Sequence, residues 1–256
     1  MLPAGPHVKD CFTNPSTGLL SYNPPNSNID APRKLFLEMS TIDQPNSKFV
    51  AEAIASSSHP GIYIDAPVSG GPNGAEAATL TIMVGSSSPD DFNLVLPILR
   101  TMGSPKSIFH CGGPGAGLAT KAINNYLSFI CTLGTCEAMN MGRLYGLDPK
   151  VLAGVINVSS GQNYNSRDQN PVKGVTATAA SAKDFEGGFS MELCKGVVDM
   201  AIQLGEEVGA KSVMKGVVKD VLEKAIESDK CRGKDCRSVY KLFSEDEGKD
   251  LNGVGE

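Results

Sequence analysis

Short apolar runs alternate with amphipathic stretches through the first half of the chain. Four short runs rich in β-branched or aromatic residues predict strands at residues 35–39, 61–66, 79–85 and 107–111. Between them, residues 45–57 and 89–102 carry apolar positions at helical spacing. Strands that alternate with helices at this spacing predict an α/β sheet.

The pattern changes after the glycine-rich segment Gly112–Gly115. Residues 116–145 contain no proline and place small and apolar residues at helical spacing, which predicts one long helix. Further helices are predicted at residues 149–158, 188–209 and 211–228, and no strand is predicted after residue 111. We therefore predict an α/β part over residues 1–113 and an all-α part over residues 114–256.

The first 34 residues are rich in proline, glycine, asparagine and serine. The consecutive prolines Pro24 and Pro25 can continue neither a helix nor a central strand. We predict loop for this whole stretch, with a surface insertion around the two prolines.

Composition excludes several classes of protein. The 256 residues carry 28 acidic and 23 basic side chains, and this net charge of −5 argues against nucleic acid as a partner. No apolar run approaches the roughly 20 residues that span a bilayer, so no membrane partner is expected. The seven cysteines include no CxxC pair, and with His7 and His110 they show no zinc-ligand spacing. We therefore expect free thiols and no metal.

Two segments carry residues suited to chemistry. In Asp65–Gly71, the Ser69 hydroxyl and the unhindered N–H groups of Gly70 and Gly71 follow a strand and could cradle a carboxylate or phosphate. An ordinary glycine-rich turn is the alternative.

In the second segment, Lys121 lies in the apolar opening of the long helix and shares a face with Asn125. Burial would lower the pKa of this lysine and suit it to acid–base work, whereas the alternative is a surface lysine. The preceding glycines only begin a GxGxxG pattern, because Leu118 occupies the third position.

Two later segments are polar or glycine-rich. Residues 157–163 form a polar helix end, and Gly187-Gly188 precedes Phe189 and Lys195. Spacing alone favours a plain C-cap and turn for the first segment, and a capped surface helix is the alternative for the second.

Taken in order, these segments resemble the β-hydroxyacid dehydrogenase family, and within it the 3-hydroxyisobutyrate dehydrogenases. Residues 65–71 and 80–85 resemble the family's substrate-binding signature, and residues 115–125 resemble its catalytic helix. Met1-Leu2-Pro3 and Ser40–Asp43 are similar to segments that end two Rossmann strands, and the resemblance runs to about residue 245.

The resemblance implies a fold and an activity. Residues 1–113 would be part of an NAD(P)-binding Rossmann-like sheet, N-terminally truncated, and residues 114–256 a 6-phosphogluconate dehydrogenase-like helical domain. The family oxidises a small 3-hydroxy acid to its semialdehyde with NAD, or with NADP, in valine catabolism. It is usually mitochondrial, with the cytoplasm as the alternative, and it forms homo-oligomers through the helical domain.

The resemblance also assigns roles to individual residues. Lys121 would move the hydroxyl proton, and Asn125 would orient the hydroxyl. The substrate carboxylate would be held by Ser69, Gly70 and Gly71. The cofactor would be contacted by Leu2, Pro3, Thr41, Phe189 and Lys195.

Two departures from the family pattern change these expectations. No GxGxxG loop occurs in the 256 residues, so we expect little cofactor binding and doubtful activity. Gly196 stands where the family usually has an aspartate, which affects the orientation of Lys195. The alternatives are an inactive truncated paralogue that acts as a dimer partner, or a related semialdehyde reductase.

Overall fold

The computed structural model describes residues 1–21, 34–57 and 61–244. The chain divides into two compact units, Met1–Asn124 and Asn125–Glu256. The division falls inside the long helix α5 (Ala116–Tyr145). The boundary expected between residues 113 and 114 stays a prediction.

The first unit contains a mixed five-stranded sheet. Its strands are β1 (Leu35–Glu38), β2 (Ile62–Asp65), β3 (Val68–Ser69), β4 (Leu80–Gly85) and β5 (Gly103–Gly112). The order is β1-β2-β4-β3, with β5 also paired to β4. The pairs β1–β2 and β4–β5 are parallel, whereas β2–β4 and β3–β4 are antiparallel. The α/β sheet predicted from sequence is confirmed.

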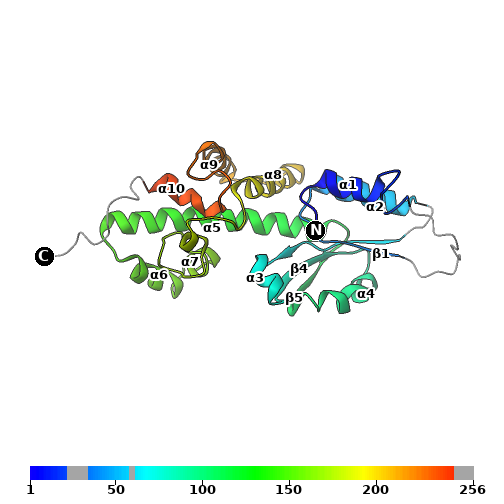
Figure 1. Ribbon diagram of the computed structural model, residues 1–256, viewed down its shortest axis with the longest axis horizontal. Coiled ribbons are helices and arrows are strands. Elements are labelled where there is room, and N and C mark those ends of the chain that lie inside the picture. The colour runs from blue at the N-terminus through cyan, green and yellow to red at the C-terminus, as the bar shows by residue number, and fades with distance from the viewer. Residues whose placement is uncertain (22–33, 58–60, 245–256) are drawn as a thin grey trace. The chain divides into compact units, whose positions relative to one another are not determined.

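Helices cover both faces of this sheet (Figure 1). On one face, α1 (Gly5–Thr13) and α2 (Gln44–Ala55) bury Val8 and Val50 against Tyr63. On the other face, α4 (Pro89–Leu99) buries Val95 and Leu99 against a cluster that includes Ile64. Because adjacent residues of a strand point to opposite faces, Tyr63 and Ile64 serve the two layers. The short helix α3 (Gly71–Glu76) follows β3.

The loop predicted for the first 34 residues is wrong in part, because residues 5–13 form α1. Pro6 lies in the first turn of this helix, where its missing N–H costs nothing. Val8 and Phe12, four positions apart, give the helix a buried face. The Pro24-Pro25 segment lies outside the described residues.

The second unit is helical within its described residues. It contains the rest of α5, followed by α6 (Pro149–Asn157), α7 (Tyr164–Arg167), η1 (Ala180–Lys183), α8 (Met191–Glu207), α9 (Lys215–Glu227), η2 (Cys236–Val239) and α10 (Tyr240–Phe243). Phe129 and Met139 of α5 pack in one core with Met191 of α8 and Leu222 of α9. The predicted long helix over residues 116–145 is confirmed. None of the helices in the described ranges combines the length and apolarity required to cross a bilayer.

Candidate active site

A carboxylate at the end of β2 caps the start of α5. Asp65 is fully buried, and its carboxylate oxygens accept hydrogen bonds from the N–H groups of Gly115 at 2.7 Å and Leu118 at 3.0 Å. A helix N-terminus presents unpaired N–H groups and positive potential, so a carboxylate is a favourable partner there. The carboxyl end of β2 therefore fixes the position at which α5 begins.

The close approach of α5 to the sheet depends on two glycines. A Cβ atom on Gly117 would clash with the Met83 carbonyl oxygen and lie 2.9 Å from Asp65 Oδ2. A Cβ atom on Gly85 would overlap the same carboxylate. Glycine at both positions lets the first turn of α5 lie directly on the strand ends.

A second buried carboxylate lies beside Asp65. Glu38 pairs with Asp65 in the register of β1 and β2 and is 6% exposed. Its Oε1 accepts the Ser40 N–H at 2.7 Å, whereas Oε2 is buried and has no hydrogen-bond partner among the described residues. Burial raises the pKa of Glu38, and it raises the pKa of Asp65 although backbone N–H donors oppose that shift.

The two segments expected at the nicotinamide lie together. The Leu2 N–H donates a hydrogen bond of 2.7 Å to Ser40 Oγ, which joins Leu2-Pro3 to Ser40-Thr41. The Glu38 carboxylate holds the backbone of Ser40 from the other side. Sequence reasoning missed the roles of Glu38 and Ser40, because their contacts depend on strand register and on a distant segment.

The expected carboxylate cradle forms a turn between β3 and α3. Ser69 pairs with Thr81 of β4 and is half-buried, whereas Gly70 and Gly71 are exposed. Gly70 and Gly71 have φ angles of +136° and +62°, which glycine adopts without strain. Within the described residues, no hydrogen bond joins this turn to Lys121.

Lys121 lies in the second turn of α5 and is 9% exposed. Its amine makes no hydrogen bond or ion pair among the described residues, and burial lowers its pKa to about 8 from an ordinary 10.5. Such an amine exchanges its proton near neutral pH, which suits general acid–base catalysis. Asn125 follows four positions later on the same helix.

The remaining candidates, Phe189 and Lys195, belong to the second unit. Asp235 is buried and accepts the Phe189 N–H at 3.0 Å, which fixes the turn before α8. Lys195 Nζ lies 2.5 Å from Asp199 Oδ2, one helical turn further along α8. Lys195 therefore has a carboxylate partner even though Gly196 follows it. The spacing of four positions could have revealed Asp199 in the sequence.

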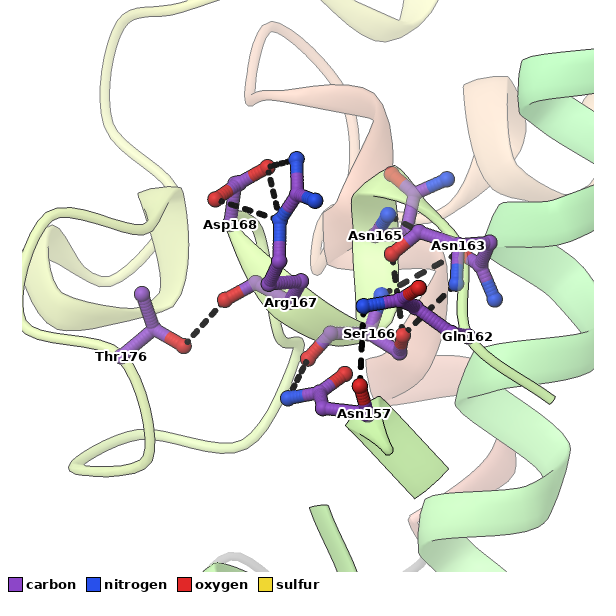
Figure 2. A network of polar contacts seen from close by, with 8 residues as sticks. All are labelled: Asn157, Gln162, Asn163, Asn165, Ser166, Arg167, Asp168 and Thr176. Carbon is purple, nitrogen blue, oxygen red and sulfur yellow. Dashed lines mark hydrogen bonds and ion pairs between the residues drawn. The ribbon is translucent and has the colours of Figure 1, made fainter. Parts of the chain in front are cut away.

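The polar helix end at residues 157–163 is the start of a cap network (Figure 2). Asn163 Oδ1 accepts the N–H groups of Asn165 and Ser166, and the Ser166 hydroxyl accepts the Asn163 N–H. Asn157 donates to the Ser166 carbonyl at 3.3 Å. These bonds explain the polar residues as caps of α7. Among the described residues, no group of three histidine, cysteine or acidic side chains could hold a metal ion.

Comparison with known protein families identifies both parts of the chain. Residues 1–113 match the model of the NAD-binding domain of 6-phosphogluconate dehydrogenase. Residues 115–243 match the NAD-binding model of NADP-dependent 3-hydroxyisobutyrate dehydrogenase.

Individual relatives agree with the family models. The chain is 36% identical to a probable mitochondrial 3-hydroxyisobutyrate dehydrogenase of Arabidopsis thaliana over 252 residues, which is 95% of this chain and 70% of that protein. It is 35% identical to the 3-hydroxyisobutyrate dehydrogenase of Pseudomonas aeruginosa, with 98% of this chain and 79% of that protein covered. The human mitochondrial enzyme is 36% identical, with 83% of this chain and 62% of that protein covered.

A solved structure supports the same assignment. The 3-hydroxyisobutyrate dehydrogenase of Mycobacterium tuberculosis, solved with L-serine, superposes with a TM-score of 0.79 at 30% identity. The superposition covers 95% of this chain and 77% of that one. The chain belongs to the 3-hydroxyisobutyrate dehydrogenase family of NAD(P)-dependent oxidoreductases.

Proposed function

We propose that the protein oxidises a small 3-hydroxy acid to its semialdehyde with NAD, or with NADP in its place. The observation that carries this proposal is Lys121, a nearly buried amine with a pKa lowered to about 8 and no partner among the described residues. Family membership supports it, because the curated relatives are named 3-hydroxyisobutyrate dehydrogenases.

A bound nicotinamide cofactor would supply the acceptor for the hydride from the carbinol carbon. Lys121 in its neutral form takes the hydroxyl proton during oxidation and returns it during reduction. Asn125 orients the hydroxyl group. The substrate carboxylate is held by the Ser69 hydroxyl and the N–H groups of Gly70 and Gly71.

The residues of the first unit fit the nicotinamide end of this cofactor. Leu2 and Pro3 supply apolar surface beside Ser40 and Thr41, and the Leu2–Ser40 hydrogen bond joins the two segments. The buried Oε2 of Glu38 has no donor among the described residues, so an acceptor is available near these segments. Phe189 and Lys195 are further residues proposed to contact the cofactor.

The test is a panel of hydroxy acids and semialdehydes with NAD and with NADP. Cofactor reduction with 3-hydroxyisobutyrate supports the proposal, and faster turnover of another semialdehyde makes the protein a related reductase. Micromolar binding of NAD or NADP would support this proposal and overturn the expectation, drawn from the sequence, of little cofactor binding. Folded protein that binds neither cofactor would favour the non-catalytic paralogue.

We also propose that the protein forms a homo-oligomer through its helical unit. Apolar side chains remain exposed near the end of α5 and on α6, including Tyr145, Met141, Leu144, Val151 and Val155. An apolar surface of this kind is typical of subunit contacts. Light scattering should show a dimer or larger species, and Val151→Asp with Val155→Asp should reduce it to a monomer. A monomeric parent protein would contradict this proposal.

We propose a mitochondrial location, which the mitochondrial names of several curated relatives support, and a role in valine catabolism. Fractionation of cells that express the gene at its natural level tests the location. Loss of growth on valine after gene disruption, with growth on glucose kept, tests the role. Recovery in the cytoplasm alone would favour the alternative location.

A further inference from the structure

We infer that Asp65 is a positioning residue for Lys121, because it fixes the first turn of α5 on the end of β2. This inference rests on the proposed function only for its catalytic consequence. The geometry concerns residues of the first unit alone.

The start of α5 depends on a distant cap. Its first turn is held by the Asp65 carboxylate through the N–H groups of Gly115 and Leu118. Gly112 and Gly115 precede or open the helix with φ angles of +131° and +86°. Because glycine has the widest conformational freedom, the chain before α5 does not by itself define where the helix begins. The cap from β2 supplies that definition.

The contact between α5 and the sheet has no room for a shift. Gly117 faces the Met83 carbonyl, the Gly85 N–H and the Asp65 carboxylate so closely that a Cβ atom would overlap them. Two N–H groups of this turn bind one carboxylate, and the backbone of the turn lies directly against the backbone of β4. Together these contacts hold the turn in a single position.

Lys121 is the titratable residue next along this helix. Leu118 donates to Asp65, and Lys121 lies one helical turn later. Its pKa is lowered by burial, with no nearby charge as a cause, so its proton affinity reports how well water is excluded. We therefore expect a loosened first turn to admit water to the amine and to return its pKa toward the ordinary 10.5.

Asp65 is buried beside a second carboxyl group and a phenol. Burial raises the pKa of Glu38 of β1 and of Tyr63 of β2, and the Asp65 charge adds a smaller rise to both. Burial raises the pKa of Asp65, and the backbone N–H groups at the start of α5 oppose that rise. The sheet and α5 therefore stabilise each other through one carboxylate.

The test measures the pKa of Lys121 from the ¹³Cε chemical shift of labelled lysine as a function of pH. The Lys121 signal is identified by its loss in Lys121→Arg. In Asp65→Asn, the amide group turns a donor toward one of the two helix N–H groups. We expect the midpoint for Lys121 to rise by at least one pH unit, a tenfold gain in proton affinity. Gly117→Ala keeps the carboxylate but separates α5 from β4, and it should raise the same midpoint.

Matched controls separate this effect from general destabilisation. Asp148 caps α6 through the N–H groups of Lys150 and Val151, so Asp148→Asn removes an equivalent cap elsewhere. Gly134→Ala adds a methyl group on α5 where nothing lies within 4 Å. Both variants should leave the Lys121 midpoint unchanged.

Each outcome has a defined meaning. A folded Asp65→Asn or Gly117→Ala protein with an unchanged midpoint overturns the inference, as does a midpoint near 10.5 in the parent chain. If a variant does not fold, fast amide hydrogen exchange at Leu118 in the parent protein overturns it as well. If the midpoint shifts but the parent protein turns over no hydroxy acid, the positioning role stands and the proposed function fails. If the parent protein turns over a hydroxy acid but the midpoint does not move, the proposed function stands and the positioning role fails.

Discussion

An oxygen of the Asp65 carboxylate lies 2.7 Å from the backbone nitrogen of Gly115, although 50 positions separate the two residues in the chain. This contact joins the end of β2 to the start of α5, the helix that carries Lys121. The segment that begins at Asp65 and the start of the helix that carries Lys121 are thereby connected within one compact unit.

Burial of Lys121 costs stability. Its pKa is lowered to about 8, so between pH 8 and 10.5 the folded protein binds fewer protons than the unfolded chain. The unfolding free energy of the first unit should therefore rise with pH across this window. Lys121→Met removes the buried charge and should stabilise the unit by about 3 kcal/mol at pH 7.

Urea denaturation at pH 7 and above pH 10.5 checks this prediction. The gain from Lys121→Met should vanish at the higher pH, because the parent amine is then neutral in both states. Lys150→Met, at an exposed position of α6, should show no such pH dependence. An equal gain at both pH values would mean that the methionine improves packing alone.

The direction of catalysis should depend on pH through the same amine. Oxidation needs the neutral form of Lys121, so its kcat should rise as pH increases through about 8. Reduction needs the protonated form and should fall over the same range. Steady-state rates in both directions test this, and parallel profiles for the two directions would count against Lys121 as the proton-transfer group.

The buried ion pair of Arg237 and Asp235 should stabilise the turn that carries Phe189. Arg237 Nη1 lies 3.1 Å from Asp235 Oδ1, and the two side chains are 13% and 3% exposed. Arg237→Met leaves a buried carboxylate without its partner and should cost about 3–5 kcal/mol of unfolding free energy.

Thermal and urea unfolding of the helical unit measure that loss. Adding Asp235→Asn to Arg237→Met should recover part of it, since the remaining charge is removed. Arg167→Met is the matched control, because its partner Asp168 lies at the surface and the pair contributes little. Losses of similar size in both single variants would contradict a buried ion pair.

Substitutions on the buried and exposed faces of α5 should differ in their effect on stability. Phe129 is 2% exposed within the helical core, whereas Leu127 is 58% exposed on the opposite side. Phe129→Ala should cost about 3–5 kcal/mol, and Leu127→Ala much less. Equal losses of stability would place Leu127 in a subunit contact.

Local sequence signals predict most of the elements. The long helix has the bounds predicted from the sequence, because residues 116–145 lack proline and keep one apolar face. Helix α1 is not predicted because Pro6 is interpreted as a loop residue, although proline is favoured in a first helical turn.

Contacts between segments that are distant in the chain could not be predicted from the sequence. Lys121 stands out because a lysine is unusual in an apolar helix, and the structure buries it. The cap by Asp65 and the bond from Leu2 to Ser40 depend on tertiary packing, which no local pattern encodes. The catalytic and binding roles of the candidate residues stay predictions.

The most direct test measures the rate of NAD reduction with 3-hydroxyisobutyrate for the purified parent protein and for the Lys121→Ala variant. The parent protein should turn over, and the variant should be slower by about 10²–10⁴-fold with an unchanged fold by circular dichroism. Turnover by Lys121→Ala at the parent rate would contradict the central claim that Lys121 moves the proton.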